Sequence, residues 1–312
     1  MRAIDWVPGA VIAERYRLVR RVGEGGMGVI WAADDLVTGR RTALKRIKDA
    51  VDDPAARRRF LHEARAASVV RHPNVVEMFD VLELETGPPV LAMELLDGES
   101  LRDVLVRDRT LSVPALADVL VPVIGAVGAA HALGVVHRDL KPENIFLARG
   151  ADGARVVKVL DFGIAKLTAL DGEAMRSAGL TTTAVIGTPA YMAPEQVFGE
   201  RDIDHRADIW ALGVVVYECL AGVRPTEGDN VGQVLKHVVA RPFVPLAQQV
   251  DGVPDGVSRL VERMLQRERS HRIADLHDAL AVLAPFASAP GVPFGAPAAH
   301  FARADAAVAE TV

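Results

Sequence analysis

Cysteine is almost absent from this sequence of 312 residues, which contains only Cys219. One thiol cannot form a disulfide framework, and a zinc centre built from several cysteines is excluded as well. This composition suits a reducing setting, so we expect a cytoplasmic location. We interpret Cys219 itself as a small buried apolar residue.

A large excess of one charge is also missing, because the formal net charge at pH 7 is −5. Nucleic acid and anionic membrane surfaces are therefore not expected as main partners. Half of the residues are hydrophobic and a quarter are charged, which is ordinary for a soluble globular protein. The length allows one large domain or two modest ones with an ample core.

No long hydrophobic run is free of charged or ionisable residues. Residues 1–18 lack the basic stretch and apolar run of a signal peptide. Residues 113–136 are long enough to mimic a membrane span, yet they contain Asp118 and His131, and a charge near the middle of a span is costly. We therefore predict a buried helix of a soluble domain there, and no membrane span in this chain.

What the sequence does contain is a change of pattern near residue 97. The part before it reads mostly as β-strands separated by glycine turns, with one helical segment that begins near Asp53. The later part contains long apolar helical stretches, at residues 114–133, 208–222, 230–240 and 257–283. Residues after 285 are rich in alanine, proline and glycine, which is typical of a flexible linker or end. We expect an α+β protein with a small β-rich lobe followed by a larger helical one.

Three glycines with the spacing GxGxxG, Gly23, Gly25 and Gly28, lie between two predicted strands. A dinucleotide-binding fold needs a helix after this motif, and here the strand-like segment GVIWAADD follows. The sequence contains no GxxxxGK[ST] motif either. The loop is therefore either a plain hairpin or a turn whose backbone N–H groups cover phosphates.

Lys45 lies on a predicted strand among apolar neighbours, and Glu63 lies in the helical segment that follows. A lysine that points into a cleft needs an anion to meet it. Lys45 is therefore either paired with Glu63 or a solvated strand residue, and the spacing alone leaves both interpretations open.

The segment VVHRDLKPENIFL, residues 135–147, sets charged residues between aliphatic ones. Charges near a core are costly unless they pair or perform chemistry. Asp139 is placed to accept a proton from a substrate hydroxyl, and Lys141 to neutralise charge on a transferred phosphoryl group. Asn144 and Asp161, the latter in the apolar segment KVLDFGIAKL, supply oxygen ligands of the kind that Mg²⁺ prefers.

Taken in order, these motifs resemble those of the eukaryotic-like (Hanks-type) serine/threonine protein kinases of bacteria. The resemblance includes the glycine loop, Lys45, Glu63, HRDLKPEN, DFG, GTPAYMAPE and DIWALGVVVYE. Ile30 stands where the family usually has valine, and TALK stands for VAIK. The resemblance implies a bilobal kinase fold, with an N-terminal extension at 1–13, a smaller lobe at 14–96, a larger lobe at 97–285 and a flexible tail at 286–312.

The resemblance implies ATP and Mg²⁺ as cofactors, with Mn²⁺ as an alternative metal ion. Asp139 is then the catalytic base, with Lys141 as the second catalytic residue. Asn144 and Asp161 hold the metal ion. We assign no chemical role to Glu143, which we expect to face substrate or solvent.

The same resemblance implies a nucleotide site between the two lobes. Lys45, held by Glu63, contacts the α- and β-phosphates. Met93 resembles the gatekeeper, and Glu94 and Leu96 lie in the hinge that reads adenine through backbone groups. The other implied residues are Val22, Gly23, Glu24, Gly25, Gly26, Met27, Gly28, Val29 and Ile30 over the phosphates, and Ala43, Phe146 and Leu160 around the adenine ring.

Several buried residues also gain roles from the resemblance. His137 and Phe162 resemble members of a buried spine, so we interpret His137 as structural and not catalytic. Asp208 is expected to hold the backbone of the turn before the catalytic aspartate. Glu195 is expected to pair with Arg272.

The family resemblance also bears on substrates and control. LKPEN together with Thr188 resembles the serine/threonine-specific class, so we expect protein substrates with Ser or Thr acceptors. Arg138 suggests control by phosphorylation, because a buried arginine needs an anionic partner. Thr181, Thr182 and Thr183 are candidates, with Thr182 favoured by its spacing to Thr188, and an unmodified polar turn is the alternative. Autophosphorylation would bring two copies of the chain together as a homodimer.

Two other classes of protein compete with an active protein kinase. A pseudokinase that serves as a scaffold usually lacks one of three residues, which here are Lys45, Asp139 and Asp161, and all three are present. A small-molecule phosphotransferase of related fold has no need of GTPAYMAPE, which shapes a protein-substrate groove. An ATP-dependent serine/threonine protein kinase is therefore the favoured interpretation.

Overall fold

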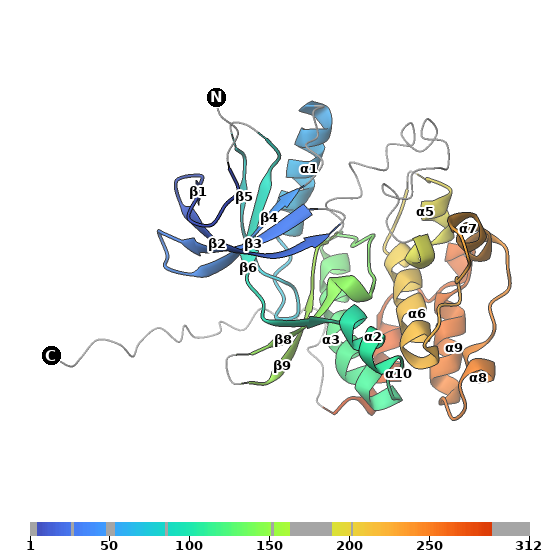
Figure 1. Cartoon of the computed structure of the whole chain (residues 1–312). Helices are drawn as coiled ribbons and strands as arrows, with labels where there is room; N and C mark the ends of the chain where they lie inside the picture. The colour runs from blue at the N-terminus through green and yellow to red at the C-terminus, as the bar shows by residue number, and fades with distance from the viewer. Residues whose placement is uncertain are drawn as a thin grey trace.

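The structure of the protein is a computed structural model, which describes residues 5–25, 28–47, 54–84, 87–150, 153–162, 189–200 and 202–288. Within these ranges, a six-stranded sheet and one helix form a smaller lobe. A larger lobe consists mainly of helices and also carries a three-stranded sheet (Figure 1). The predicted α+β arrangement with a small β-rich lobe before a larger helical one is confirmed.

The sheet of the smaller lobe is antiparallel throughout, with the strand order β1–β2–β3–β4–β6–β5. Gly28 on β3 lies so close to β4 that a Cβ atom there would meet the carbonyl oxygen of Arg46 at 2.3 Å, so only glycine fits. The strands are β1 (Val11–Ile12), β2 (Tyr16–Gly25), β3 (Gly28–Asp35), β4 (Arg41–Ile47), β5 (Met78–Leu82) and β6 (Val90–Glu94).

The two faces of this sheet are covered by different segments. On one face, Trp31 and Leu44 pack in a cluster with Ile12, which comes from the N-terminal segment and is fully buried. On the other face lies the helix α1 (Pro54–Ala67), where Phe60 is buried in the main core. Because β1 pairs with β2, the residues just before 14 form part of the sheet and stabilise its outer face.

The larger lobe is organised around α6, in which fourteen of sixteen residues are buried. A helix that is apolar on all sides must lie inside a protein. Cys219 lies on this helix and is fully buried, as expected. The helices of this lobe are α2 (Leu101–Asp108), α3 (Val113–Ala132), α5 (Pro194–Val197), α6 (Arg206–Ala221), α7 (Val231–Val239), α8 (Leu246–Gln249), α9 (Asp255–Met264) and α10 (His277–Leu283).

Among the described residues, α3 is the one helix long and apolar enough to cross a membrane by length and composition. Of the residues in its apolar window, 67% are buried inside the protein. The predicted buried helix is therefore confirmed, since α3 packs against α6 and α10 in the core.

The predicted helical stretch at residues 257–283 is wrong as a single helix. The chain forms α9 and α10 with a short 3₁₀ turn between them, Arg269–His271. At Arg272 the backbone is extended, with φ −66° and ψ 168°. This residue buries its guanidinium against five oxygen atoms, and these bonds fix the break.

A three-stranded antiparallel sheet, β7–β8–β9, lies beside α2 and α3 (Figure 1). Its strands are β7 (Gly98–Ser100), β8 (Ile145–Arg149) and β9 (Arg155–Val159). The 3₁₀ helix η1 (Pro142–Asn144) leads directly into β8. Asp161 follows β9 after one residue. This sheet therefore brings the segments around Asp139 and Asp161 together.

Candidate active site

The loop of residues 137–144, called the catalytic loop after its predicted role, brings three of the predicted site residues together. Nζ of Lys141 donates to Oδ2 of Asp139 at 2.8 Å. Nδ2 of Asn144 donates to the carbonyl oxygen of Asp139 at 2.7 Å and to its Oδ2 at 3.2 Å. Asp139 and Asn144 are each 6% exposed. The loop therefore holds one carboxylate in a fixed direction, with a cation beside it.

The turn before Asp139 is held by Asp208 from α6, as the sequence predicts. Oδ2 of Asp208 accepts from the backbone N–H of His137 at 2.8 Å, and Oδ1 accepts from that of Arg138 at 2.7 Å. His131 also bonds to Oδ2, with Nε2 at 2.8 Å, a contact that the sequence did not reveal. Burial alone would raise the pKa of Asp208, but His131 and the backbone bond from His137 hold it below its usual value.

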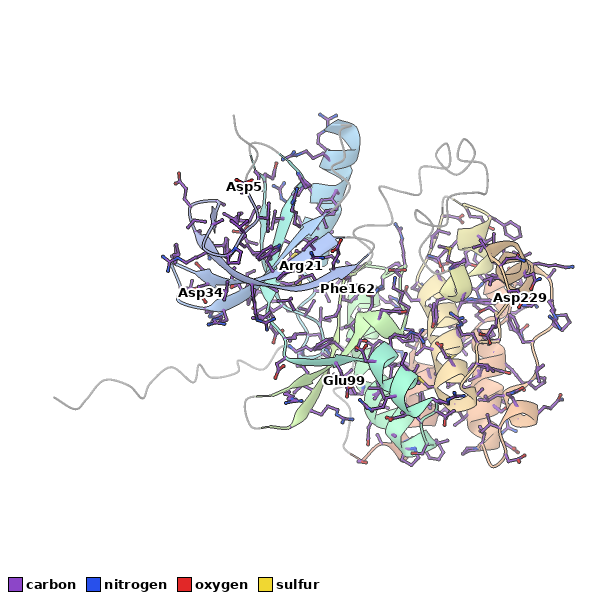
Figure 2. All side chains as sticks on the ribbon, viewed as in Figure 1. Asp5, Arg21, Asp34, Glu99, Phe162 and Asp229 are labelled. Atoms are coloured by element: carbon purple, nitrogen blue, oxygen red, sulfur yellow. The ribbon has the colours of Figure 1, made fainter. Side chains whose placement is uncertain are left out.

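His137 packs inside the protein against Leu160 and Phe162. It is fully buried, its Nε2 lies 2.8 Å from the carbonyl oxygen of Leu160, and its ring centroid is 4.8 Å from that of Phe162. Burial lowers the pKa of His137, so the ring is neutral near pH 7. The predicted buried pair of His137 and Phe162 is confirmed, and Figure 2 shows Phe162 at the junction between the two lobes.

Asp161 lies beside Asn144 and meets Lys45 from the other lobe. The backbone N–H of Leu160 donates to the carbonyl oxygen of Asn144 at 2.9 Å, which places Asp161 next to the catalytic loop. Nζ of Lys45 lies 2.5 Å from Oδ2 of Asp161, and the Lys45 side chain is 7% exposed. Lys45 is thus a buried, paired lysine and not a solvated one. The side chain of Glu63, its predicted partner, lies outside the described residues.

The donor set near Asp161 fits a magnesium ion that is completed by phosphate and water. Asn144 uses its amide nitrogen on Asp139, so the oxygen of the same amide is the atom that can face a cation. Asp161 contributes a carboxylate that is 25% exposed. Within the described ranges, no group of three or more His, Cys, Asp or Glu could hold a metal ion. Two oxygen ligands and no dedicated cage are usual for Mg²⁺ bound with a nucleotide.

Four of the residues predicted for the nucleotide site pack in or against the main core cluster, which reaches from the smaller lobe into the larger one, namely Ile30, Ala43, Met93 and Leu160. Ile30 lies opposite Lys45 in the β3–β4 register, and Ala43 lies opposite Met93 in the β4–β6 register. Phe146 and Leu96 are partly buried, so their contact with adenine stays a prediction.

The predicted phosphate loop is described only in part. Val22, Gly23, Glu24 and Gly25 form the end of β2, and Gly26 and Met27 lie outside the described residues. The side chain of Val29 packs with the cluster on the outer face of the sheet. Val29 can therefore serve a nucleotide only through its backbone.

Glu94 is expected to contact adenine through its backbone, and its side chain makes other contacts. Its Oε2 accepts from Nζ of Lys158 on β9 at 2.8 Å and from the backbone N–H of Glu77 at 3.3 Å. This ion pair ties the connection between the lobes to the larger lobe. The sequence did not predict it, since 64 residues separate the two side chains.

Arg138 has a buried Nε atom with no partner among the described residues. Thr181, Thr182 and Thr183, the candidate phosphorylation sites, lie outside the described residues, and so does Thr188, which is expected to bear on substrate specificity. A buried guanidinium atom without an acceptor is the signature expected of a site that receives an anion. The regulatory assignment stays a prediction.

The predicted pair of Glu195 and Arg272 is confirmed. Nη1 and Nη2 of Arg272 bond to Oε1 and Oε2 of Glu195 at 2.6 and 2.7 Å, and both side chains are at most 4% exposed. This bidentate pair fixes α5, and with it the end of the segment GTPAYMAPE, against the connection between α9 and α10.

Sequence reasoning missed one polar network near the catalytic loop. Arg102 on α2 donates to Glu143 at 3.1 Å, to Glu218 at 3.0 Å and to the hydroxyl of Tyr191. The Tyr191 hydroxyl in turn donates to Glu218 at 2.5 Å. A capping box at Ser100 marks the start of the helix α2 in the sequence, but no pattern joins residues so far apart.

The chain matches the family model for the protein kinase domain over residues 16–282, and it belongs to that family. Its relatives are bacterial serine/threonine kinases of the Hanks type. It is 38% identical over 275 residues to the serine/threonine-protein kinase pkn3 of Myxococcus xanthus, covering 87% of this chain and 49% of that protein.

Two further relatives agree with this placement. The serine/threonine-protein kinase Pkn1 of Myxococcus xanthus is 40% identical over 263 residues, covering 84% of this chain and 36% of that protein. The serine/threonine-protein kinase PknA of Mycobacterium tuberculosis is 37% identical over 269 residues, covering 85% of this chain and 59% of that protein. The chain spans less than two thirds of the length of each of these relatives.

Proposed function

We propose that this chain transfers the γ-phosphoryl group of ATP to serine and threonine hydroxyls of proteins, itself included. The observation that carries the proposal is the convergence of Asp139, Lys141 and Asn144 on one side and the Lys45–Asp161 pair on the other. The family implies the use of ATP and a divalent metal ion. The named relatives are serine/threonine-protein kinases, which supports the same acceptors here.

In this proposal each residue has one task. Asp139 accepts the proton of the attacking hydroxyl, and Lys141, bonded to the same carboxylate, balances charge on the transferred group. Lys45 orients the phosphates. Asn144 and Asp161 would hold Mg²⁺, or Mn²⁺ in its place, which neutralises charge on the phosphate oxygens when bound.

The finer features of the proposal concern organisation and control. The smaller lobe would comprise residues 14–96, with β1 of the preceding extension added to its sheet, and the larger lobe residues 97–285, with a tail after them. Phosphorylation of Thr182 would supply an anion for Nε of Arg138, which has no partner among the described residues, and a transient homodimer would allow one copy to modify the other. A reducing compartment with ATP, such as the cytoplasm, suits this activity.

The test is transfer of label from γ-labelled ATP to the purified chain and to a general protein substrate, with and without Mg²⁺. We expect Mg²⁺-dependent transfer, and we expect Asp139→Asn and Lys45→Met each to lower it by a factor of about 100 or more, because general-base catalysis and positioning of the phosphates are lost. Asp251→Asn and Lys236→Met make the same chemical changes at exposed positions and serve as matched controls.

Two outcomes would contradict the proposal. Transfer that persists in both Asp139→Asn and Lys45→Met would show that other residues perform the chemistry. A wild-type chain that binds nucleotide without transferring label would instead favour a pseudokinase. Mass spectrometry of the phosphorylated sites separates serine and threonine acceptors from all others.

A further inference from the structure

Residues 6–12, which precede the matched kinase domain, lie across the outer face of the sheet in the smaller lobe. They contact three neighbouring strands. The ring centroid of Trp6 lies 6.4 Å from that of Trp31 on β3 and 5.4 Å from Cζ of Arg46 on β4. The residues that follow pair with β2 through two backbone hydrogen bonds of 2.8 Å and then form β1. We call this segment the N-terminal strap.

The N-terminal strap is anchored along its length. Trp6 and Ala10 pack against the apolar cluster of the outer face, and Ile12 is fully buried within that cluster. Between them the chain turns at Gly9, where φ is 89°, a left-handed conformation that glycine adopts without strain. The strap is therefore a fixed layer on the sheet, although it lies before the residues that the kinase family model matches.

The three strands under the N-terminal strap are those that carry the predicted phosphate contacts. The strand β2 ends at Gly25 and β3 begins at Gly28, and these two glycines lie opposite each other in the register. The strand β4 carries Lys45. A segment that contacts all three strands from the outer face fixes their spacing, and with it the distance from the glycine loop to Lys45.

The path from Trp6 to the glycine loop passes through one residue, Arg46. Its side chain lies against Trp6, and its neighbour on β4 is Lys45. Its backbone carbonyl is the group that Gly28 approaches so closely that a Cβ atom would lie 2.3 Å away. Val29 lies opposite Arg46 in the register and packs with the outer cluster. A shift of Arg46 would therefore move the base of the glycine loop and the strand of Lys45 together.

We propose that the N-terminal strap preorganises the nucleotide site, with Trp6 as a positioning residue for the glycine loop and Lys45. The inference rests on the proposed function. Without the Trp6 ring, Trp31 loses an aromatic neighbour and Arg46 loses its cation–π partner. The strands β3 and β4 then gain freedom that nucleotide binding has to remove. A bound nucleotide restores the arrangement through its own contacts, so affinity for ATP falls while transfer at saturation is preserved.

The test is steady-state kinetics of Trp6→Ala, together with calorimetric titration of a non-hydrolysable ATP analogue in the presence of Mg²⁺. We expect the KM for ATP and the dissociation constant of the analogue to rise about fivefold. The kcat and the KM for the protein substrate should stay within about twofold of wild type. Trp6→Phe keeps an aromatic ring against Arg46 and should restore both nucleotide constants to within about twofold of wild type.

A second variant and two controls separate positioning from stability. Arg46→Met keeps an unbranched apolar side chain without the cation and should raise the dissociation constant about two- to threefold, so the proposal does not depend on the folding of Trp6→Ala. Val7→Ala changes an exposed neighbour of Trp6 and should leave every constant unchanged. Leu84→Ala empties space in the same outer cluster beyond β5. It should lower the melting temperature and leave the dissociation constant within about twofold of wild type.

Three results would overturn the proposal. The first is a Trp6→Ala variant with a lower melting temperature and an unchanged dissociation constant, which would mean that the strap only stabilises the fold. The second is an equal rise of the dissociation constant in Leu84→Ala. The third is a fall of kcat at an unchanged KM for ATP. A wild type that binds the analogue but transfers no label refutes the proposed function alone, because the dissociation constants test the strap without transfer. A wild type that binds no analogue refutes both.

Discussion

At the scale of single residues, the site combines backbone strain with strong local bonds. Arg138 and Asp161 have φ angles of 64° and 49°, in the left-handed region. A residue with a Cβ atom costs roughly 1–2 kcal/mol there, so its surroundings have to compensate. The N–H of Arg138 donates to Asp208 and its carbonyl oxygen accepts from Gln196. Asp161 bonds to Lys45. The strain thus lies at Arg138, next to the proposed base Asp139, and at Asp161, which the proposal assigns to the metal ion.

The substitution Asp208→Asn tests how the turn before Asp139 is held. An amide has one acceptor oxygen, whereas the carboxylate of Asp208 accepts from the backbone of His137 and Arg138 at two different oxygens. One buried N–H would therefore lose its acceptor, and we expect the free energy of unfolding to fall by about 2 kcal/mol. We also expect kcat to fall by about tenfold or more, because Asp139 loses its direction. Denaturant unfolding and steady-state kinetics measure the two effects.

Asp204→Asn is the matched control, because Asp204 bonds to the backbone N–H of Arg206 near the start of the same helix but lies outside the site. It should lower stability slightly and leave kcat near the wild-type value. If Asp208→Asn lowers the free energy of unfolding but leaves kcat unchanged, Asp208 stabilises the fold without positioning Asp139, and the prediction is contradicted.

At the scale of secondary-structure elements, the connection between β3 and β4 depends on one carboxylate. Asp35, at the end of β3, accepts from Arg15 at 2.9 and 2.7 Å, from the backbone N–H of Val37 at 3.0 Å and from the hydroxyl of Thr38 at 2.7 Å. The bond from Arg15, opposed by burial and aided by Thr38 and Val37, holds the pKa of Asp35 well below its usual value. The ionised form is thus favoured in the folded state.

This lowered pKa predicts how stability depends on pH. Because the folded pKa of Asp35 lies below the unfolded one, its stabilisation is complete above about pH 4 and is lost as the pH falls further. We expect Asp35→Asn to lower the free energy of unfolding at pH 7 by about 1–2 kcal/mol. Its stability should then fall less steeply than that of wild type between about pH 4 and pH 2. Urea unfolding at a series of pH values checks both effects.

The neighbouring substitution Asp34→Asn is the control for Asp35→Asn. Asp34 pairs with Arg41 at 2.8 Å, but the two side chains are 39% and 64% exposed, and exposed ion pairs contribute little. If both substitutions changed the dependence of the free energy of unfolding on pH by the same amount below pH 4, this dependence could not be assigned to Asp35.

Motifs with fixed local spacing made much of the site predictable from the sequence. Asp139, Lys141 and Asn144 lie within six residues of one another, so one loop must bring them together. Asp208 and the pair of Glu195 and Arg272 followed from the family resemblance, and both are confirmed. Strand alternation and apolar helical stretches likewise predicted most of the long elements.

What the sequence could not predict are contacts between distant segments that no periodic pattern marks. Arg102 and Glu218 are 116 residues apart, and each alone looks like a surface charge on a helix. The break between α9 and α10 escaped prediction for a similar reason. The extended backbone at Arg272 is fixed by Glu195, 77 residues earlier, and not by a local helix-breaking residue such as proline.

At the scale of the whole molecule, the two lobes meet through both charge and apolar packing. Lys45 belongs to the sheet of the smaller lobe and Asp161 to the larger lobe, 116 residues later. The apolar cluster that contains Ala43 and Met93 continues into the larger lobe through Leu140 and Val159. A nucleotide bound at this junction would contact both lobes, so binding should stabilise the molecule as one unit.

Because of this coupling, we expect the stability of the molecule to depend on nucleotide and metal ion together. With a non-hydrolysable ATP analogue and Mg²⁺ at about 100 times the dissociation constant, binding adds about 2.7 kcal/mol to the free energy of unfolding. For a chain of this size the melting temperature should rise by roughly 4–5 °C, and EDTA should remove most of the rise. Asp161→Asn and Lys45→Met should each reduce the rise at the same ligand concentrations, whereas Asp251→Asn, at an exposed position, should keep it. A full rise in the presence of EDTA, or in Asp161→Asn, would show that the metal ion is not held by Asp161 at the junction of the lobes.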